Sequence, residues 1–182
     1  ASGLVGGAFH ARLARTGVSL VGTSHANPRA GLVPFPLSAD TAAFLDAHPS
    51  DLVILASAMT HVDRCEQEPE EAWWRNVTET QAVRDWCLAH GAALLYFSTD
   101  YVFDGAAGPY DEAAIVRPIN VYGRSKLAAE ALVSALPRSS LRVRVDTMKL
   151  RSSGLRTVMA PAASEASPMT VIWRPTGKTC SV

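Results

Sequence analysis

Short apolar runs rich in β-branched residues alternate along the chain with longer segments of helical period. The apolar runs predict strands at 18–22, 32–35, 51–57, 92–98 and 141–145, and the helical segments predict helices at 5–15, 40–47, 69–90 and 121–136. Such alternation is typical of βαβ units, in which helices cover a parallel sheet. The run at 92–98 is apolar on both faces and predicts a central strand, while Trp73, Val77 and Val83 predict a buried stripe on the long helix.

Composition leaves few other classes of protein open. The 182 residues are 48% hydrophobic and 19% charged, which is ordinary for one globular domain. Basic and acidic side chains number 17 each, so charge predicts no nucleic-acid partner. No apolar run approaches the roughly 20 residues that cross a bilayer, which predicts no membrane partner. Cys65, Cys87 and Cys180 form an odd set without metal-ligand spacing, so we expect reduced thiols, no metal and a cytoplasmic protein.

A glycine pair stands where the chain enters its first predicted helix. Gly3 and Gly6 occupy the place where a dinucleotide-binding loop directs backbone amides at a pyrophosphate, although such a pair alone also marks ordinary turns. The complete fingerprint has a strand and another glycine before this point, whereas this chain begins at Ala1. We therefore expect a fragment of a Rossmann-like, doubly wound parallel sheet that lacks its first strand. A stable fold then needs another segment between strands 18–22 and 51–57.

The first predicted strand ends without a carboxylate that could bind a ribose 2′-hydroxyl. Gly22 is followed by Thr23, Ser24 and His25, with Arg29 further along. Small polar and cationic side chains accept a 2′-phosphate instead, so Ser24 and His25 are candidate cofactor ligands and favour NADP(H) over NAD(H). The alternative is that His25 and Arg29 are solvated loop residues.

Candidate proton-transfer groups lie on the helix predicted at 121–136. Tyr122 and Lys126 are four residues apart and therefore share one helix face. A neighbouring cation is expected to lower the pKa of the phenol from its ordinary value of about 10, and Lys126 can also hydrogen-bond a nicotinamide ribose. Ser98 and Thr99 follow the central strand, at the edge where parallel sheets bind ligands, and a hydroxyl there can donate to a carbonyl oxygen.

Taken together, these segments resemble the dTDP-4-dehydrorhamnose reductase family of the extended short-chain dehydrogenase/reductase superfamily. The resemblance is carried by the Ser-Thr-Asp-Tyr-Val-Phe-Asp-Gly segment at 98–105, by 118–126 with 127–130, and by 56–63 with 66–69 and 76–77. It runs over residues 1–145, the cofactor-binding half of a typical family member. It implies an NAD(P)H-dependent oxidoreductase that reduces the C4 ketone of a nucleotide-linked deoxysugar in dTDP-rhamnose biosynthesis.

The resemblance also implies roles for single residues. Thr99 would polarise the ketone, Tyr122 would protonate its oxygen and Lys126 would assist. Asp100 and Tyr101 would lie near the sugar. The residues implied to contact the cofactor, besides Tyr122 and Lys126, are Gly3, Leu4 and Val5 at the pyrophosphate, Leu37 at the adenine, and Ala56, Ser57, Ala58 and Ser98 along its length.

The resemblance leaves the domain organisation and the function with alternatives. Residues 1–145 are expected to form the NAD(P)-binding domain, which is incomplete at its N-terminus. Residues 146–182 show neither the helical nor the strand period, so we expect them to form a poorly ordered or divergent tail in place of most of the C-terminal substrate domain. The resemblance extends to the β regulatory subunit of methionine adenosyltransferase, which works by binding a partner enzyme. A sugar-nucleotide epimerase, which uses the same tyrosine–lysine chemistry with a retained cofactor, is a third alternative. A nucleotide-sugar substrate is expected for the enzyme, with a homodimer or a partner synthetase as open alternatives. We predict reduction only from a form with the first strand and the substrate domain.

Overall fold

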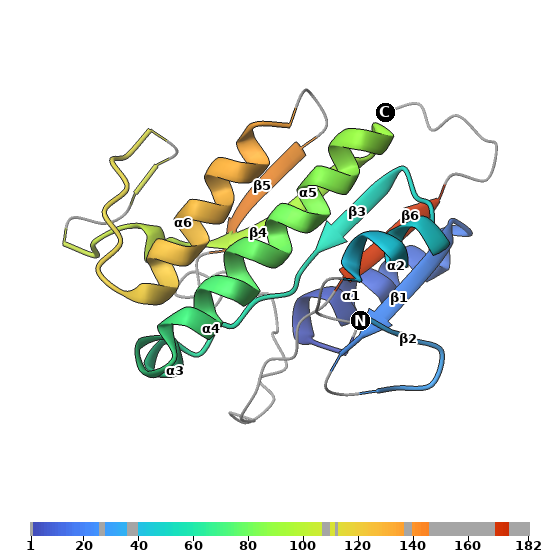
Figure 1. The fold of residues 1–182 in the computed structure, drawn as a ribbon, viewed down its shortest axis with the longest axis horizontal. Helices are drawn as coiled ribbons and strands as arrows, with labels where there is room; N and C mark the ends of the chain where they lie inside the picture. Colours follow the sequence, from blue (N-terminus) through green and yellow to red (C-terminus); the bar gives the residue numbers. More distant parts are fainter. Residues whose placement is uncertain are drawn as a thin grey trace.

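The computed structural model describes residues 2–25, 28–35, 40–106, 110–111, 113–136, 140–145 and 170–174. In these ranges six strands form one sheet in the order β2-β1-β6-β3-β4-β5 (Figure 1). Strands β3, β4 and β5 are parallel to one another, and β1 is parallel to β2. The predicted parallel α/β sheet of Rossmann-like type is therefore confirmed. The strands are β1 Ser19–Ser24, β2 Val33–Pro34, β3 Leu52–Leu55, β4 Ala93–Thr99, β5 Ser140–Val145 and β6 Thr170–Arg174.

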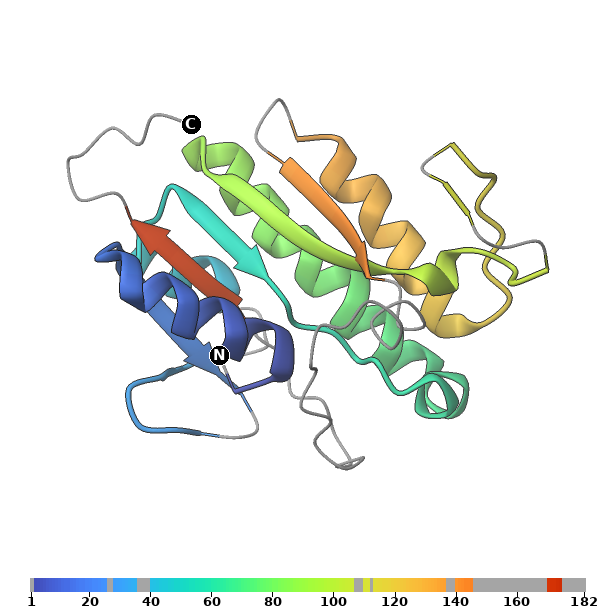
Figure 2. The ribbon, with the colours of Figure 1, turned by 180° about the vertical axis from the view of Figure 1, so that it is seen from behind.

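Strand β6 lies between β1 and β3 and runs antiparallel to both (Figure 2). It occupies the position for which the sequence predicted a substitute segment, and its backbone pairs with both neighbours. The expectation of a tail outside the domain is wrong for this part of 146–182. Its run of Thr, Val, Ile, Trp and Arg has the β-branched and aromatic composition of a strand. The other residues after Val145 lie outside the described ranges.

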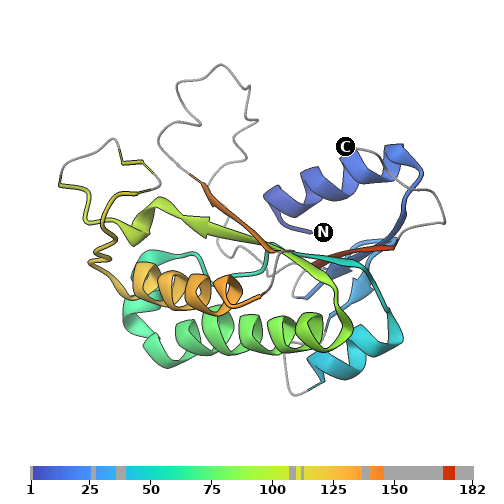
Figure 3. The same ribbon diagram turned by 90° about the horizontal axis from the view of Figure 1, so that it is seen from above.

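Helices lie on both faces of the sheet (Figure 3). Helix α1, Leu4–Leu13, packs on one face, where Phe9 meets Phe97 of β4 edge to face with ring centroids 5.3 Å apart. A short 3₁₀ turn, η1 at Ala14–Thr16, follows it. Helices α2 Thr41–Ala47, α5 Glu79–His90 and α6 Val121–Ser134 cover the other face. The main core lies under these three helices and includes Leu45, Val53, Val83, Leu94 and Val133.

The helix predicted at 69–90 is interrupted. It consists of α4 Pro69–Trp73, a π-helical turn η2 at Trp74–Thr78, and α5, which ends at Gly91 in the left-handed conformation with φ 66°. Val77 and Val83 are buried as expected, but Trp73 is 45% exposed, so its assignment to the buried stripe is wrong. The wider π turn puts the preceding helix out of phase with the following one. Helix α3, Val62–Gln67, was not predicted.

The direction of the strands determines where a ligand site can form. Because β6 is antiparallel to both β1 and β3, these two strands run the same way and share a carboxyl edge with β4. Open parallel sheets bind ligands at this edge. No helix within the described ranges is both long and apolar enough to cross a membrane.

Candidate active site

The end of β4 brings a hydroxyl to the carboxyl edge. Thr99 is the last residue of the strand and is buried. Its Oγ1 accepts a hydrogen bond from the backbone N–H of Tyr101 at 3.2 Å and donates one to Oδ1 of Asp100 at 3.1 Å. These bonds turn the chain into the 3₁₀ turn η3, Asp100–Val102. The hydroxyl of Thr99 is thus fixed in direction by its own turn.

The start of α6 is held against that turn. The side chain of Asn120 accepts the backbone N–H of Gly123 at 2.7 Å, and Oε1 of Glu66 on α3 accepts the backbone N–H of Val121 at 2.5 Å. These two acceptors satisfy amides that the first turn of a helix leaves free. A Cβ at Gly123 would collide with the carbonyl oxygen of Tyr101. Glycine therefore allows the backbone of α6 to approach η3 closely and brings Tyr122 beside Thr99.

Tyr122 lies in a mostly apolar setting. It is 8% exposed and packs with Met59, Cys65 and Ala72. The Thr99 side chain lies close enough to its hydroxyl to lower the pKa of the phenol, and the ring of Tyr101 stands edge-on at a centroid distance of 5.6 Å. Burial raises the pKa of Tyr122 to about 12, and the nearby Thr99 side chain opposes this shift only in part. The expected lowering of this pKa is therefore wrong, because loss of hydration outweighs it.

Lys126 lies one helical turn beyond Tyr122 and is 2% exposed. Its Nζ donates to the backbone carbonyl of Phe97 at 2.7 Å and sits over the ring of Tyr96, 4.1 Å from the centroid. Burial lowers the pKa of Lys126 to about 7. Both side chains of the predicted pair thus face the sheet at the end of β4, as their spacing predicted.

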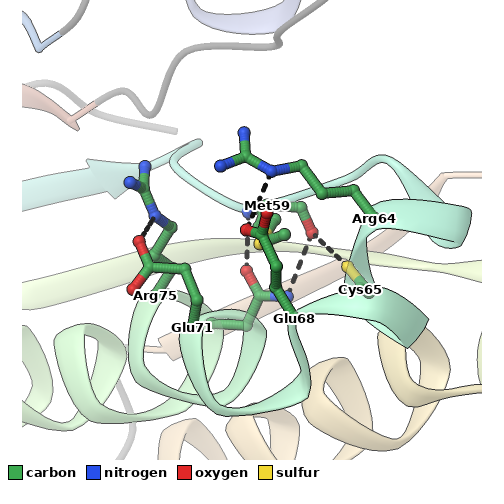
Figure 4. A network of polar contacts seen from close by, with 7 residues as sticks. Met59, Arg64, Cys65, Glu68, Glu71 and Arg75 are labelled. Atoms are coloured by element: carbon green, nitrogen blue, oxygen red, sulfur yellow. Dashed lines mark hydrogen bonds and ion pairs between the residues drawn. The ribbon is translucent and has the colours of Figure 1, made fainter.

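A buried amide, which the sequence did not single out, ties α6 to the rest of the site. Asn76 in η2 accepts the backbone N–H of Met59 at 2.7 Å, and its Nδ2 lies 3.1 Å from the Met59 carbonyl and 2.9 Å from the Ser125 hydroxyl. Figure 4 shows the backbone of Met59 and the thiol of Cys65 in this network. No pattern in the sequence distinguishes Asn76 from the other polar residues of this helical segment, of which Glu79 and Thr80 are also buried.

Two ion pairs flank this network, as Figure 4 also shows. They are Arg64 with Glu68, at 3.0 Å, and Arg75 with Glu71. Both pairs are four residues apart on their helices and partly exposed, so they add little to stability. The hydrogen bonds of Asn76, rather than these ion pairs, join the π turn to the segment after β3 and to α6.

The residues predicted to contact a cofactor lie along the same edge. Gly3 is the N-cap of α1, Ser24 ends β1, and Ala56, Ser57 and Ala58 follow β3. Within the described ranges, the hydroxyls of Ser2, Ser57 and Ser98 are buried and have no hydrogen-bond partner in the protein. Buried polar groups are normally paired, so these three hydroxyls fit an elongated polar ligand at this edge.

The remaining residues predicted for the site differ in where the structure places them. Leu37 lies outside the described residues, as do the side chain contacts of Leu4. His25 is exposed, and its Nδ1 lies 3.3 Å from the carbonyl oxygen of Phe35. Tyr101 is 40% exposed beside Tyr122, and Asp100 raises the pKa of Tyr122. The structure thus brings Thr99, Tyr122 and Tyr101 together.

A parallel sheet with a tyrosine–lysine helix beside the end of an inner strand defines a Rossmann-like domain of short-chain dehydrogenase/reductase type. Comparison with known proteins narrows the class. The chain belongs to the family described as the RmlD substrate binding domain, whose model matches residues 1–178.

Three relatives illustrate the similarity. A dTDP-4-dehydrorhamnose reductase from Aggregatibacter actinomycetemcomitans is 39% identical over 101 residues, which are 55% of this chain and 34% of that protein. Methionine adenosyltransferase 2 subunit beta from Xenopus laevis is 31% identical over 150 residues, covering 81% of this chain and 45% of that protein. The crystal structure of a Bacillus anthracis dTDP-4-dehydrorhamnose reductase in complex with NADP is 32% identical, with a TM-score of 0.58, and covers 63% of this chain and 44% of that one. The chain therefore spans a third to just under half the length of these relatives.

Proposed function

We propose that this chain carries the cofactor-binding and proton-transfer part of a sugar-nucleotide reductase of the dTDP-4-dehydrorhamnose reductase type. The observation that supports the proposal is the placement of Thr99, at the end of β4, close to the buried phenol of Tyr122, at the start of α6, with Lys126 on the same helix face as Tyr122. The substrate class follows from the relatives named as dTDP-4-dehydrorhamnose reductases.

The protein groups would act on the ketone oxygen. The raised pKa of Tyr122, about 12, keeps the phenol protonated at neutral pH, so its Oη can donate a proton to the oxygen as negative charge develops there. Thr99, held by η3, would turn its hydroxyl from Asp100 to donate a hydrogen bond to the same oxygen. When bound, reduced nicotinamide supplies the hydride that forms the new C–H bond at C4. Ketone, hydride and proton together give the alcohol.

The other assigned residues would hold the reactants. The backbone amides of Gly3, Leu4 and Val5 stand at the N-terminus of α1, where a pyrophosphate is favoured. Ser57 and Ser98 offer hydroxyls without protein partners. The remaining assignments are that Ala56 and Ala58 flank the cofactor, Lys126 binds the nicotinamide ribose, Leu37 contacts the adenine, and Asp100 and Tyr101 contact the sugar.

We further propose NADP(H) as the cofactor. Ser24 and His25 close β1 without a carboxylate that would repel a 2′-phosphate. Replacing Ser24 with Asp should therefore weaken binding of NADPH and leave binding of NADH less affected. Fluorescence titration of both cofactors measures this, and an equal loss for both would contradict the assignment.

Reduction itself is tested by following NADPH oxidation with dTDP-4-dehydrorhamnose. The chain and a longer form with the first strand and substrate domain are compared, each with its Tyr122→Phe variant. We expect turnover in the longer form and its loss in Tyr122→Phe. Undiminished turnover in Tyr122→Phe would show that another group is the acid.

A regulatory subunit is the second candidate, because the similarity to methionine adenosyltransferase 2 subunit beta covers 81% of this chain. This alternative predicts cofactor binding without ketone reduction, together with binding to a methionine adenosyltransferase catalytic subunit. Mixing the purified proteins and measuring their sedimentation distinguishes it from the reductase.

A further inference from the structure

A buried ion pair lies one helical turn beyond Lys126. Glu130 follows Lys126 by four residues on α6, and it is 2% exposed. Its carboxylate accepts two hydrogen bonds from Arg144 of β5, from Nε to Oε1 at 2.8 Å and from Nη2 to Oε2 at 2.6 Å. Two parallel bonds of this kind fix both the distance and the orientation of the carboxylate. The proposed function assigns a role to neither residue.

Lys126 needs a nearby negative charge. The interior that surrounds it offers the Phe97 carbonyl and the Tyr96 ring, but little water. Burial favours the neutral amine, and the carboxylate of Glu130 acts in the opposite direction by raising the pKa of Lys126. The helical spacing keeps these two side chains on one face of α6.

The other titratable groups near α6 are neutral or engaged elsewhere. On β4, burial raises the pKa of Tyr96 well above its ordinary value, and Tyr122 is also neutral at pH 7. Asp100 on η3 and Cys65 on α3 both raise the pKa of Tyr122. Glu66 accepts the Val121 amide. The charged groups and the histidine of the π turn and α5 make four contacts: Arg75 with Glu71, Glu79 with Thr41, Arg84 with Asp85, and His90 with Asp46.

We propose that Glu130 and Arg144 are positioning residues for Lys126: Arg144 fixes the Glu130 carboxylate one turn beyond the ammonium, and this fixed negative charge favours the protonated form of Lys126 inside the domain. The guanidinium of Arg144 also lies over the ring of Phe103, 5.2 Å from its centroid, which adds a second constraint on its position. The relevance of this arrangement to catalysis rests on the proposed function, in which a charged Lys126 binds the nicotinamide ribose.

The direct test titrates Lys126 in the full chain without cofactor, by NMR of lysines labelled at the ε-carbon. The lysines of the chain are Lys126, Lys149 and Lys178, so Lys126→Met assigns the signal. We expect a midpoint near the pKa of about 7 in the wild type and a midpoint about one pH unit lower in Glu130→Gln. Glu130→Asp keeps the charge and should lower the midpoint less. The matched control is Glu79→Gln, which neutralises a buried carboxylate on α5 and should leave the midpoint unchanged.

A second variant guards against misfolding of the first. Glu130→Gln leaves Arg144 without its charged partner, whereas Glu130→Gln with Arg144→Met removes both charges together. A lowered midpoint in both variants supports the proposal, and an unchanged midpoint in either folded variant overturns it. The pH dependence of NADPH oxidation separates the two proposals. If reduction occurs, its alkaline limit should move down with the NMR midpoint. A shifted midpoint, together with no NADPH oxidation by the longer form that contains the first strand and the substrate domain, would contradict the reductase and support the role of Glu130.

Discussion

The two sides of the carboxyl edge differ in what satisfies their polar groups. On the α6 side, Asn76, Ser125 and Lys126 are buried and each is hydrogen-bonded to another part of the protein, and the Tyr96 hydroxyl is the exception, since it is buried there without a protein partner within the described ranges. On the side formed by α1 and β3, the buried hydroxyls of Ser2 and Ser57 have no protein partner within the described ranges. The difference suggests that the two sides have different roles. The chain itself positions the groups that would move a proton, while the groups that would contact a cofactor are left for a ligand to pair.

The largest effect should come from removing the acid on the α6 side. Tyr122→Phe should lower kcat for ketone reduction on the order of 10²–10⁴-fold, because Tyr122 is the proposed proton donor and Thr99 would supply only a hydrogen bond, while NADPH affinity stays close to that of the wild type. Stopped-flow measurement of NADPH oxidation gives the rate. The matched control is Tyr110→Phe, which removes a phenol bonded to Asp104 and should retain the rate. Equal losses in the two variants would remove the assignment of Tyr122.

The network of Asn76 should be the next most sensitive point. Asn76→Ala leaves the Met59 amide and the Ser125 hydroxyl without their buried partner, so the free energy of unfolding should fall by about 2–3 kcal/mol. Urea denaturation measures the loss. Asn120→Ala, which removes only a helix cap, should cost about 1 kcal/mol. If the two losses are alike, the Asn76 network contributes no more than a cap does.

The buried ammonium predicts a dependence of stability on pH. The pKa of Lys126 is about 7 in the folded chain and 10.5 as its ordinary value, so between these values the unfolded chain binds more protons. Stability relative to Lys126→Met should therefore rise as pH increases through this window, by at most about 1.4 kcal/mol per pH unit. Urea midpoints of both proteins across the window measure the slope. If the difference in stability between the two proteins stays constant with pH, the pKa of Lys126 is not lowered in the folded chain.

The smallest effect should appear on the cofactor side. Ser57→Ala removes a hydroxyl without a protein partner, so the free energy of unfolding should change by less than about 0.5 kcal/mol. NADPH affinity should fall by about fivefold, the value of one hydrogen bond. Ser125→Ala is the opposite case, because its hydroxyl bonds to Asn76 and to the Tyr122 carbonyl, and it should lose about 1 kcal/mol of stability. Thermal unfolding and NADPH titration of both variants would show whether the two sides differ as proposed.

Local patterns were sufficient for most of the fold. The predicted ranges agree to within a few residues with strands β1, β3, β4 and β5 and with helices α1, α2 and α6. These elements could be predicted because the spacing of apolar residues within each segment determines its period. The shared face of Tyr122 and Lys126 followed from helical geometry alone.

Features set by distant contacts could not be predicted in this way. The π turn at 74–78 coincides with the long-range hydrogen bonds of Asn76, which no periodicity reveals. The pKa of Tyr122 depends on burial by Met59, Cys65 and Ala72 from other elements, and this term exceeds the expected effect of a neighbouring cation. The need for a segment between β1 and β3 was predictable, but its identity as Thr170–Arg174 was not, because the sequence around it shows no period.

The two buried thiols give the chain internal reporters of local opening. Burial raises the pKa of Cys65 to about 11 and that of Cys87 to about 12, and only the thiolate reacts with alkylating reagents. Cys65 lies at the junction of α3 with α6, whereas Cys87 lies in the main core. With Cys180 replaced by serine, the two alkylation rates would compare how often the junction beside Tyr122 separates with how often the core does.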